Sequence, residues 1–286
     1  MELSQLRMFK KIADVGSIAR AAEQLHCVPS NISTRIKHLE EELGERLFIR
    51  KGRGLVLSPS GTVFLEYTNK ILSLCREAQR AVSPCTAPTG KLSIGAIESS
   101  ATSRLPKLLS TYHRLHPSVQ IEFATDTWKN LENAVAKHEL DGAIIAVKSA
   151  HPSLYCVEIY EEELVLIASS TFNNIDSAES LIGKNIYMWP EGCPYRKTLE
   201  NWLLENDISV PITSIASYGT ILGCVSSGAG ISLVPKGVFE QFKLIGGING
   251  YTFDQLKPIY NYFIWNKETG YHSANEAFLD LIKSEI

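Results

Sequence analysis

Long apolar segments are missing from this 286-residue chain, in which no purely aliphatic run exceeds five residues, the length of the run from Leu164 to Ala168. A membrane-spanning helix needs about 20 apolar residues. The N-terminal stretch MELSQLRMFKK also lacks the apolar core of a secretion signal. We therefore expect a cytoplasmic protein with no membrane partner.

Cysteine is scarce and unevenly spaced. The six cysteines, at positions 27, 75, 85, 156, 193 and 224, include no C-x-x-C pair, which argues against structural zinc and a disulfide framework. His113 and His116 are three residues apart on one predicted helix but have no third ligand nearby, so a solvated face is favoured over a metal site. We expect no metal and no cofactor.

A strong excess of one charge sign is also absent, because the net charge is −3. Residues 1–60 nevertheless hold ten Lys and Arg against seven Asp and Glu, whereas the other 226 residues hold 18 against 24. A basic head on an acidic body favours a polyanion partner at one end only.

Residues 4–44 have the apolar spacing of three helices. Ser17 is placed to cap the second helix, and Pro29 suits the first turn of the third, where a missing N–H is tolerated. The short turn Cys27-Val28 between these two helices gives the helix-turn-helix pattern. An ordinary three-helix bundle with a polar face is the alternative.

The third helix presents polar side chains that can donate to phosphates and base edges, with no acidic residue before Glu40. The following LFIRKGRGLVL, residues 47–57, predicts a hairpin with a basic tip, as in a DNA-binding wing. We therefore expect double-stranded DNA as a partner. The residues expected to contact it are Ser30, Asn31, Ser33, Thr34, Arg35, Lys37, Lys51 and Arg53.

The helix expected after Gly61 carries apolar side chains at alternating spacings of three and four. This is the spacing of a coiled-coil seam, so we expect the helix to join two copies and to present two recognition helices to a two-fold symmetric site. Packing within one chain is the alternative. The seam residues are Phe64, Tyr67, Ile71, Leu74 and Ala78.

Beyond a stretch rich in Pro, Ser, Thr and Gly at 83–90, short apolar strands alternate with amphipathic helices. This alternation predicts an α/β unit with a mostly parallel sheet, in one piece or as two lobes. Ligands bind such folds beyond the carboxyl ends of the strands. The predicted strands are KLSIGAI, VQIEFAT, GAIIAV, LVLIAS, NIYMWP, ITSIAS and GISLVP.

The run AAEQLHCVPSNISTRIKHLEEELGERLFIRKGRGLVLSPSG, residues 21–61, closely resembles the LysR-type transcriptional regulators of bacteria. KLSIGAI, ELDGAIIAV and SSGAGISLVP fall where that family has elements of its effector domain. The resemblance implies an N-terminal all-α winged helix-turn-helix, a long linker helix and two α/β lobes like those of periplasmic binding proteins, with a ligand cleft between them. It also implies a homotetramer built as a dimer of dimers, and RNA polymerase as a partner.

The resemblance also implies a division of the chain. It gives a winged helix-turn-helix domain at 1–60, a dimerising linker helix and hinge at 61–90, and an effector-binding domain at 91–286, with lobe one at about 91–160 and 267–286 and lobe two at about 161–266.

The resemblance implies that Ser99, Ser100, Thr127 and Thr220 contact the ligand. Their neighbours are added because ligands bind beyond the carboxyl ends of the strands. Carboxylates there suggest an amine on the effector, whereas Arg196 suggests a carboxylate, so an amino-acid-like effector satisfies both. Alternatively, Glu98 only caps its helix or pairs with Arg104. The full set expected in the cleft is Glu98, Ser99, Ser100, Thr127, Trp128, Trp189, Cys193, Tyr195, Arg196, Tyr218 and Thr220.

A redox role for Cys193 is a further alternative, which we disfavour because free cysteines are usually inert and only Arg196 is placed to lower the thiol pKa. Catalytic motifs are missing: there is no G-x-S-x-G, no H-E-x-x-H and no phosphate-binding loop. We therefore predict a ligand-responsive regulator that is not an enzyme, in which a small-molecule effector shifts the lobe arrangement. An enzyme or solute-binding module with an appended DNA-binding head is the alternative.

Overall fold

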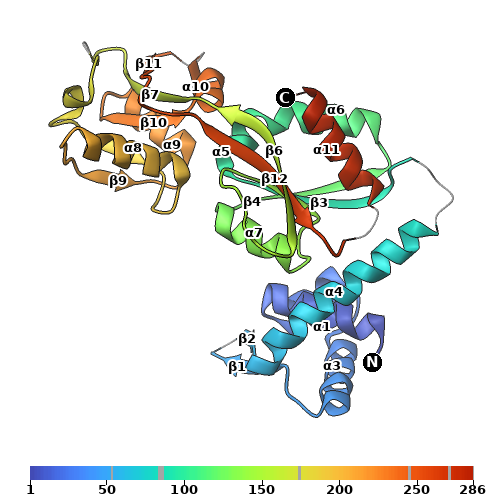
Figure 1. Cartoon of the computed structure of the whole chain (residues 1–286). Coiled ribbons are helices and arrows are strands. Elements are labelled where there is room, and N and C mark those ends of the chain that lie inside the picture. The colour runs from blue at the N-terminus through green and yellow to red at the C-terminus, as the bar shows by residue number, and fades with distance from the viewer. Residues whose placement is uncertain (53, 83–86, 173–174, 244–245, 270–271, 286) are drawn as a thin grey trace. The chain divides into compact units, whose positions relative to one another are not determined.

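The computed structural model describes residues 1–52, 54–82, 87–172, 175–243, 246–269 and 272–285 (Figure 1). Arg53, expected on the wing, lies outside the described residues. The chain divides into two units, the first built mainly from Met1–Pro84 and the second from Cys85–Ala136, Leu140–Glu268 and Ser273–Ile286. In the described part of the chain, every helix is too short or too polar to cross a membrane.

The first unit is a winged helix-turn-helix, as the sequence predicts. Ser17 caps the second helix by accepting the N–H of Arg20, and Pro29 occupies the first turn of the third. The core includes Phe9, Ile32 and Leu39, each fully buried. The elements are α1 (Leu3–Val15), α2 (Ile18–Gln24), α3 (Pro29–Leu43), β1 (Phe48–Lys51), β2 (Gly54–Leu57) and α4 (Pro59–Ala81).

The second unit holds two five-stranded sheets, one per lobe (Figure 1). The first sheet has the order β4-β3-β5-β12-β6, and the second has the order β11-β7-β10-β8-β9. Lobe one contains β3 (Gly90–Ala96), α5 (Glu98–Ser103), α6 (Leu105–Leu115), β4 (Val119–Thr125), α7 (Trp128–Ala136), β5 (Gly142–Ile145), β6 (Leu154–Glu162), β12 (Ile259–Asn266) and α11 (Ser273–Glu285). Lobe two contains β7 (Leu164–Ser169), η1 (Ala178–Leu181), β8 (Ile186–Met188), α8 (Pro194–Glu205), β9 (Ile212–Ser214), α9 (Tyr218–Ser226), β10 (Ile231–Pro235), α10 (Lys236–Lys243) and β11 (Ile248–Tyr251).

The prediction of mostly parallel sheets is wrong. Each sheet joins two parallel strand pairs to two antiparallel pairs. Three strands were not predicted, namely β6, β11 and β12. Their pairings join segments far apart in the chain, and local apolar pattern carries no information on such partners.

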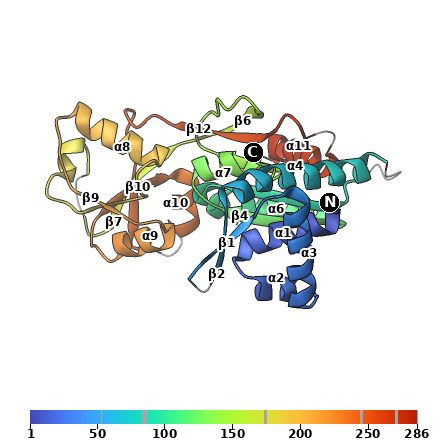
Figure 2. The ribbon, with the colours of Figure 1, turned by 90° about the horizontal axis from the view of Figure 1, so that it is seen from below.

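The expected end of lobe two at residue 266 also differs from the structure. Strand β12 belongs to the first sheet, where Phe263 pairs with Ile144 of β5 and with Val157 of β6. Strands β6 and β12 lie side by side in both views of the ribbon (Figure 2). Lobe two is therefore the continuous segment 164–258, inserted between two strands of lobe one.

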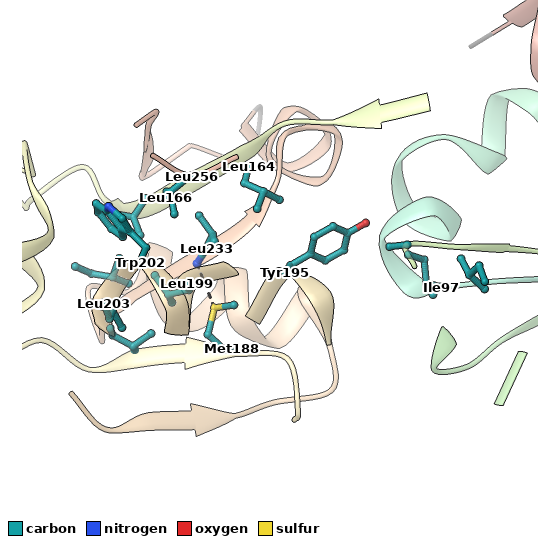
Figure 3. Packing of buried hydrophobic residues seen from close by; sticks show 14 of the residues in the cluster. Ile97, Leu164, Leu166, Met188, Tyr195, Leu199, Trp202, Leu203, Leu233 and Leu256 are labelled. Atoms are coloured by element: carbon teal, nitrogen blue, oxygen red, sulfur yellow. Dashed lines mark hydrogen bonds between the residues drawn. The ribbon is translucent and has the colours of Figure 1, made fainter. Parts of the chain in front are cut away.

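One buried cluster of lobe two lies between its sheet and α8 (Figure 3), and a second contains residues of α9 and α10. Leu199, Leu166 and Leu233 are almost completely buried there. The backbone N–H of Leu233 donates to the sulfur of Met188 at 3.4 Å, which ties β10 to β8. This packing fixes α8 on the sheet, and α8 carries Tyr195 toward Ile97 of lobe one (Figure 3).

Candidate functional site

Helix α3 displays most of the residues expected to contact DNA. Its buried side is Ile32, Ile36 and Leu39. Five of the side chains expected to contact DNA are exposed on the rest of the helix: Ser30, Asn31, Ser33, Thr34 and Lys37. Lys51 is exposed on the wing. A polar, non-acidic helix face of this kind can donate to phosphates and base edges.

Arg35 is held differently from its neighbours on α3. Its guanidinium forms a 2.7 Å ion pair with Glu2 and donates to Ser4 at 3.1 Å and to Asn31 at 3.2 Å. Glu2 lies at the start of α1, so Arg35 fastens α3 to α1. The ion pair and hydrogen bond with Arg35, together with a hydrogen bond from Ser4, lower the pKa of Glu2, which therefore stays charged at neutral pH.

The wing is positioned by side chains that the sequence did not single out. The Glu40 carboxylate accepts the N–H groups of Leu47 and Phe48 at 2.7 and 3.3 Å, so the end of α3 holds the start of β1. Ser58 accepts the N–H of Gly61 at 2.8 Å and donates to the carbonyl of Arg46 at 2.6 Å, which fixes the start of α4 beside the wing.

Helix α4 carries the residues predicted to form a seam, and one of them packs within its own unit. Phe64 packs on Phe9 of its own chain with ring centroids 5.1 Å apart, so it belongs to the core of the first unit. Tyr67 and Leu74 are 61% and 62% exposed, and together with Ile71 they leave an apolar stripe on the helix. The exposed apolar stripe therefore begins at Tyr67 and does not include Phe64.

A cavity of about 660 Å³ lies between the two lobes of the second unit. The parallel strands β3 and β4 end at the same edge of the first sheet, and the chain segments that follow them form one wall. The other wall follows β8 and β9 of lobe two. Eight of the expected effector residues line it: Glu98, Ser99, Thr127, Trp128, Trp189, Cys193, Tyr195 and Tyr218.

Hydrogen bonds join the lobes at this cavity. The indole N–H of Trp128 donates to the carbonyl of Gly192 at 2.9 Å. The hydroxyls of Ser99 and Tyr195 lie 3.2 Å apart, and Tyr195 is buried. Burial raises the pKa of Tyr195 well above its ordinary value, so this phenol is neutral.

Three expected effector residues do not line the cavity. Ser100 is buried and shares a 2.7 Å hydrogen bond with Tyr160. Thr220 donates to Ser217 at the start of α9. The buried Arg196 is engaged by the protein itself, with a 2.7 Å ion pair to Glu200. Their positions after the strand ends predicted that these three residues lie near the cavity, but the sequence does not show in which direction a side chain points.

The alternative role for Glu98, a pair with Arg104, is not what the structure shows. Arg104 instead lies 3.4 Å from the carboxylate of Glu162 and 5.1 Å from the ring centroid of Tyr160. The residue that caps α5 is Ile97, which makes no side-chain cap. The Glu98 side chain faces the cavity instead.

Cys193 occupies the N-cap position of α8 in the cavity wall. Burial raises the pKa of its thiol, although the backbone N–H groups of Arg196 and Tyr195 oppose the shift. A thiol with a raised pKa is protonated at neutral pH and reacts slowly, which favours the inert alternative over redox sensing.

Several cavity residues were missed because they are polar residues of a helix start or contribute only backbone atoms. Lys129 and Asn130 stand in the first turn of α7, and Gly192 offers only its backbone carbonyl to the site. No sequence pattern predicts that the carbonyl of Gly192 accepts the indole N–H of a tryptophan in the other lobe.

Sequence comparisons identify both units. The family described as "Bacterial regulatory helix-turn-helix protein, lysR family" matches residues 3–62, and the one described as "LysR substrate binding domain" matches residues 86–286. The chain is 39% identical over 284 residues to the uncharacterized HTH-type transcriptional regulator YusT of Bacillus subtilis (strain 168), covering 98% of this chain and 95% of the relative. It is 34% identical over 286 residues to the HTH-type transcriptional regulator SoxR of Arthrobacter sp. (strain TE1826), covering 99% and 97%.

Solved structures share the fold. A full-length OxyR variant from Pseudomonas aeruginosa matches with a TM-score of 0.80 and 22% identity, covering 99% of this chain and 98% of that one. Full-length CbnR in complex with its target DNA matches with a TM-score of 0.72 and 21% identity, covering 100% of both chains.

Proposed function

Because the chain belongs to the LysR family of transcriptional regulators, we propose that it binds a dyad-symmetric promoter site as an oligomer and senses a small metabolite between the two lobes. Like its relatives, it is a DNA-binding regulator with a substrate-binding domain and not an enzyme. The observation that carries the proposal is the exposed, non-acidic polar face of α3 beside a basic wing.

Within this proposal, α3 reads bases and the wing contacts the backbone. Ser30, Asn31, Ser33 and Thr34 are short enough to approach base edges. Lys37 and Lys51 supply charge to phosphates, and binding therefore weakens as salt rises. Arg35 contributes by holding α3 against α1, as its ion pair with Glu2 indicates. In this proposal the protein acts in the cytoplasm, where its target DNA is. RNA polymerase is the partner that responds to the protein bound at the promoter.

Footprinting of the full-length protein on its own upstream intergenic DNA tests the DNA-binding proposal. We expect a protected dyad-symmetric site, with affinity falling steeply as salt rises. Thr34→Ala is expected to weaken specific binding by about 1 to 3 kcal/mol, whereas Lys51→Ala is expected to weaken all DNA binding and to reduce the salt slope by about 1.

Lys107→Ala is the matched control for Lys51→Ala, because Lys107 is an exposed lysine on α6 of the other unit. Its DNA affinity and salt slope should equal those of the wild type. If Thr34→Ala and Lys51→Ala also left affinity unchanged, α3 and the wing would not be the DNA-reading surface.

The effector part of the proposal rests on the cavity between the lobes. A volume of about 660 Å³ is in the range of small-molecule sites, and aromatic rings with a few polar groups line it. We infer that an amine or amino-acid-like metabolite binds there and favours one arrangement of the lobes, which changes the spacing of the DNA-binding heads in the oligomer.

The oligomer part rests on the exposed stripe of α4. Leu74→Arg places a charge at the centre of the seam, so we expect loss of the dimer formed through α4 and of binding to the full two-fold site. Sedimentation velocity measures the first and gel shift the second. Leu204→Arg is the control, since Leu204 is 74% exposed on α8, outside the seam. An unchanged oligomer in Leu74→Arg would refute the seam.

A further inference from the structure

Four aromatic side chains line the cavity between the lobes: Trp128, Trp189, Tyr195 and Tyr218. Trp189 stacks on Tyr218 with ring centroids 4.9 Å apart and planes at 29°. Trp128 is fixed from the opposite lobe by its 2.9 Å hydrogen bond to Gly192. The face of an aromatic ring carries negative charge density and attracts a cation that lies over it.

Charge in the cavity wall points the same way. Glu98, Asp126 and Glu191 are acidic, against one basic side chain among the described lining residues, the exposed Lys129. Asp126 is engaged, because its carboxylate accepts the N–H of Thr127 at 2.7 Å and the amide of Asn130 at 2.8 Å.

Glu98 differs from the other two carboxylates. Glu191 is 88% exposed and lies 3.6 Å from Arg196. Glu98 is partly buried, and among the described residues its side chain has neither an ion pair nor a hydrogen bond.

Several groups that could receive an anion are already occupied. Arg196 is bound by Glu200, by Ser214 at 2.8 Å and by the carbonyl of Trp189 at 3.4 Å. The start of α9 is capped by Ser217, which accepts the N–H of Thr220. The Asp126 carboxylate already lies at the start of α7. A ligand carboxylate would therefore meet three acidic side chains and, among the described lining residues, Lys129 as the one basic side chain.

We propose that the cavity selects an organic ammonium ion, with Glu98 as its counter-ion and the rings of Trp128 and Trp189 as its walls. This inference deepens the proposed effector site and rests on it. It narrows the effector from an amino-acid-like compound to an amine whose binding does not require a carboxylate.

Three small probes with the same ring and different charge test the proposal: benzylamine, benzyl alcohol and benzoate. Titration of the full-length protein is followed by ligand-observed NMR and by tryptophan fluorescence, since Trp128 and Trp189 line the cavity. We expect benzylamine to bind in the millimolar range and at least about tenfold more tightly than either of the other probes. L-Phenylalanine, a zwitterion, is expected to bind no more tightly than benzylamine.

Glu98→Gln keeps the shape of the side chain and removes its charge, so it should weaken benzylamine binding by about tenfold or more without changing the melting temperature. Glu205→Gln is the control, because Glu205 is exposed on α8 away from the cavity. Tighter binding of benzoate or of L-phenylalanine than of benzylamine, no binding of benzylamine, or equal binding to Glu98→Gln and wild type would each overturn the proposal. The footprint on DNA would be unaffected by any of these results, so failure of this inference and failure of the proposed function are separate outcomes.

Discussion

Gly61→Ala is expected to destabilise the winged helix-turn-helix unit by about 3 kcal/mol or more. A Cβ at position 61 would lie 2.0 Å from the carbonyl oxygen of Leu47 and 2.9 Å from its carbonyl carbon. Both are backbone atoms at the start of the wing, where Leu47 also accepts the N–H of Ser58. Relief would require α4 or β1 to shift, and a small unit loses much of its stability with such a change.

Two spectroscopic signals separate this effect from the rest of the molecule. All four tryptophans, at positions 128, 189, 202 and 265, lie in the second unit. Circular dichroism at the helix band should show an earlier transition in Gly61→Ala, while the tryptophan fluorescence transition stays in place. DNA binding should be lost with the circular dichroism signal.

Gly223→Ala is the matched control, since Gly223 lies inside α9 and nothing is within 4 Å of a Cβ built there. The same substitution is therefore expected to stabilise the second unit by about 0.5 to 1 kcal/mol, through helix propensity. Equal stability of Gly61→Ala and wild type would show that the close approach of α4 to the wing is not needed.

Arg104→Met is expected to have the largest effect in the second unit. Glu162 is 2% exposed and has the Arg104 guanidinium at 3.4 Å and the N–H of Gly237 at 3.0 Å. Removing Arg104 leaves a buried carboxylate with one hydrogen bond, which costs about 2 to 3 kcal/mol, less than for a fully buried pair because Arg104 is partly exposed. Tryptophan fluorescence in urea measures this loss.

The double variant Arg104→Met with Glu162→Gln isolates the charge. Gln keeps an oxygen for the N–H of Gly237 but carries no charge, so the double variant should recover most of the stability lost in Arg104→Met, ending about 1 kcal/mol below wild type. If the double variant is less stable than Arg104→Met alone, the unpaired charge is not the cause.

The elements of the first unit could be predicted from sequence because the signals that start and end them are local. The Ser17 cap, the Pro29 start of α3 and the hairpin after it depend on neighbours within a few residues, and the structure confirms each. Phe64 was assigned to the seam because both Phe64 and Tyr67 fit its spacing. Helical spacing shows which residues share a face of the helix but not what that face packs against. Only the position of Phe9 decides that Phe64 packs inward.

The cavity was predicted in outline and not in detail. The rule that ligands bind beyond strand ends gave Glu98, Trp128 and Trp189 correctly as lining residues. The rule could not show that Arg196 forms an ion pair with Glu200. The two residues are four apart on α8 and therefore lie on one face of the helix. The carboxylate of Glu162 was not considered at all, because its partners Arg104 and Gly237 are 58 and 75 residues away.

The insertion of lobe two between β6 and β12 sets the order in which the chain can fold during synthesis. Lobe two is continuous from 164 to 258, so its sheet is complete as soon as that segment is made. Lobe one starts earlier but lacks β12, the strand that joins β5 to β6, until the chain reaches Asn266. The half of the domain that is translated first is therefore the last to close, and a chain that stops near residue 258 leaves two unpaired strand edges in lobe one.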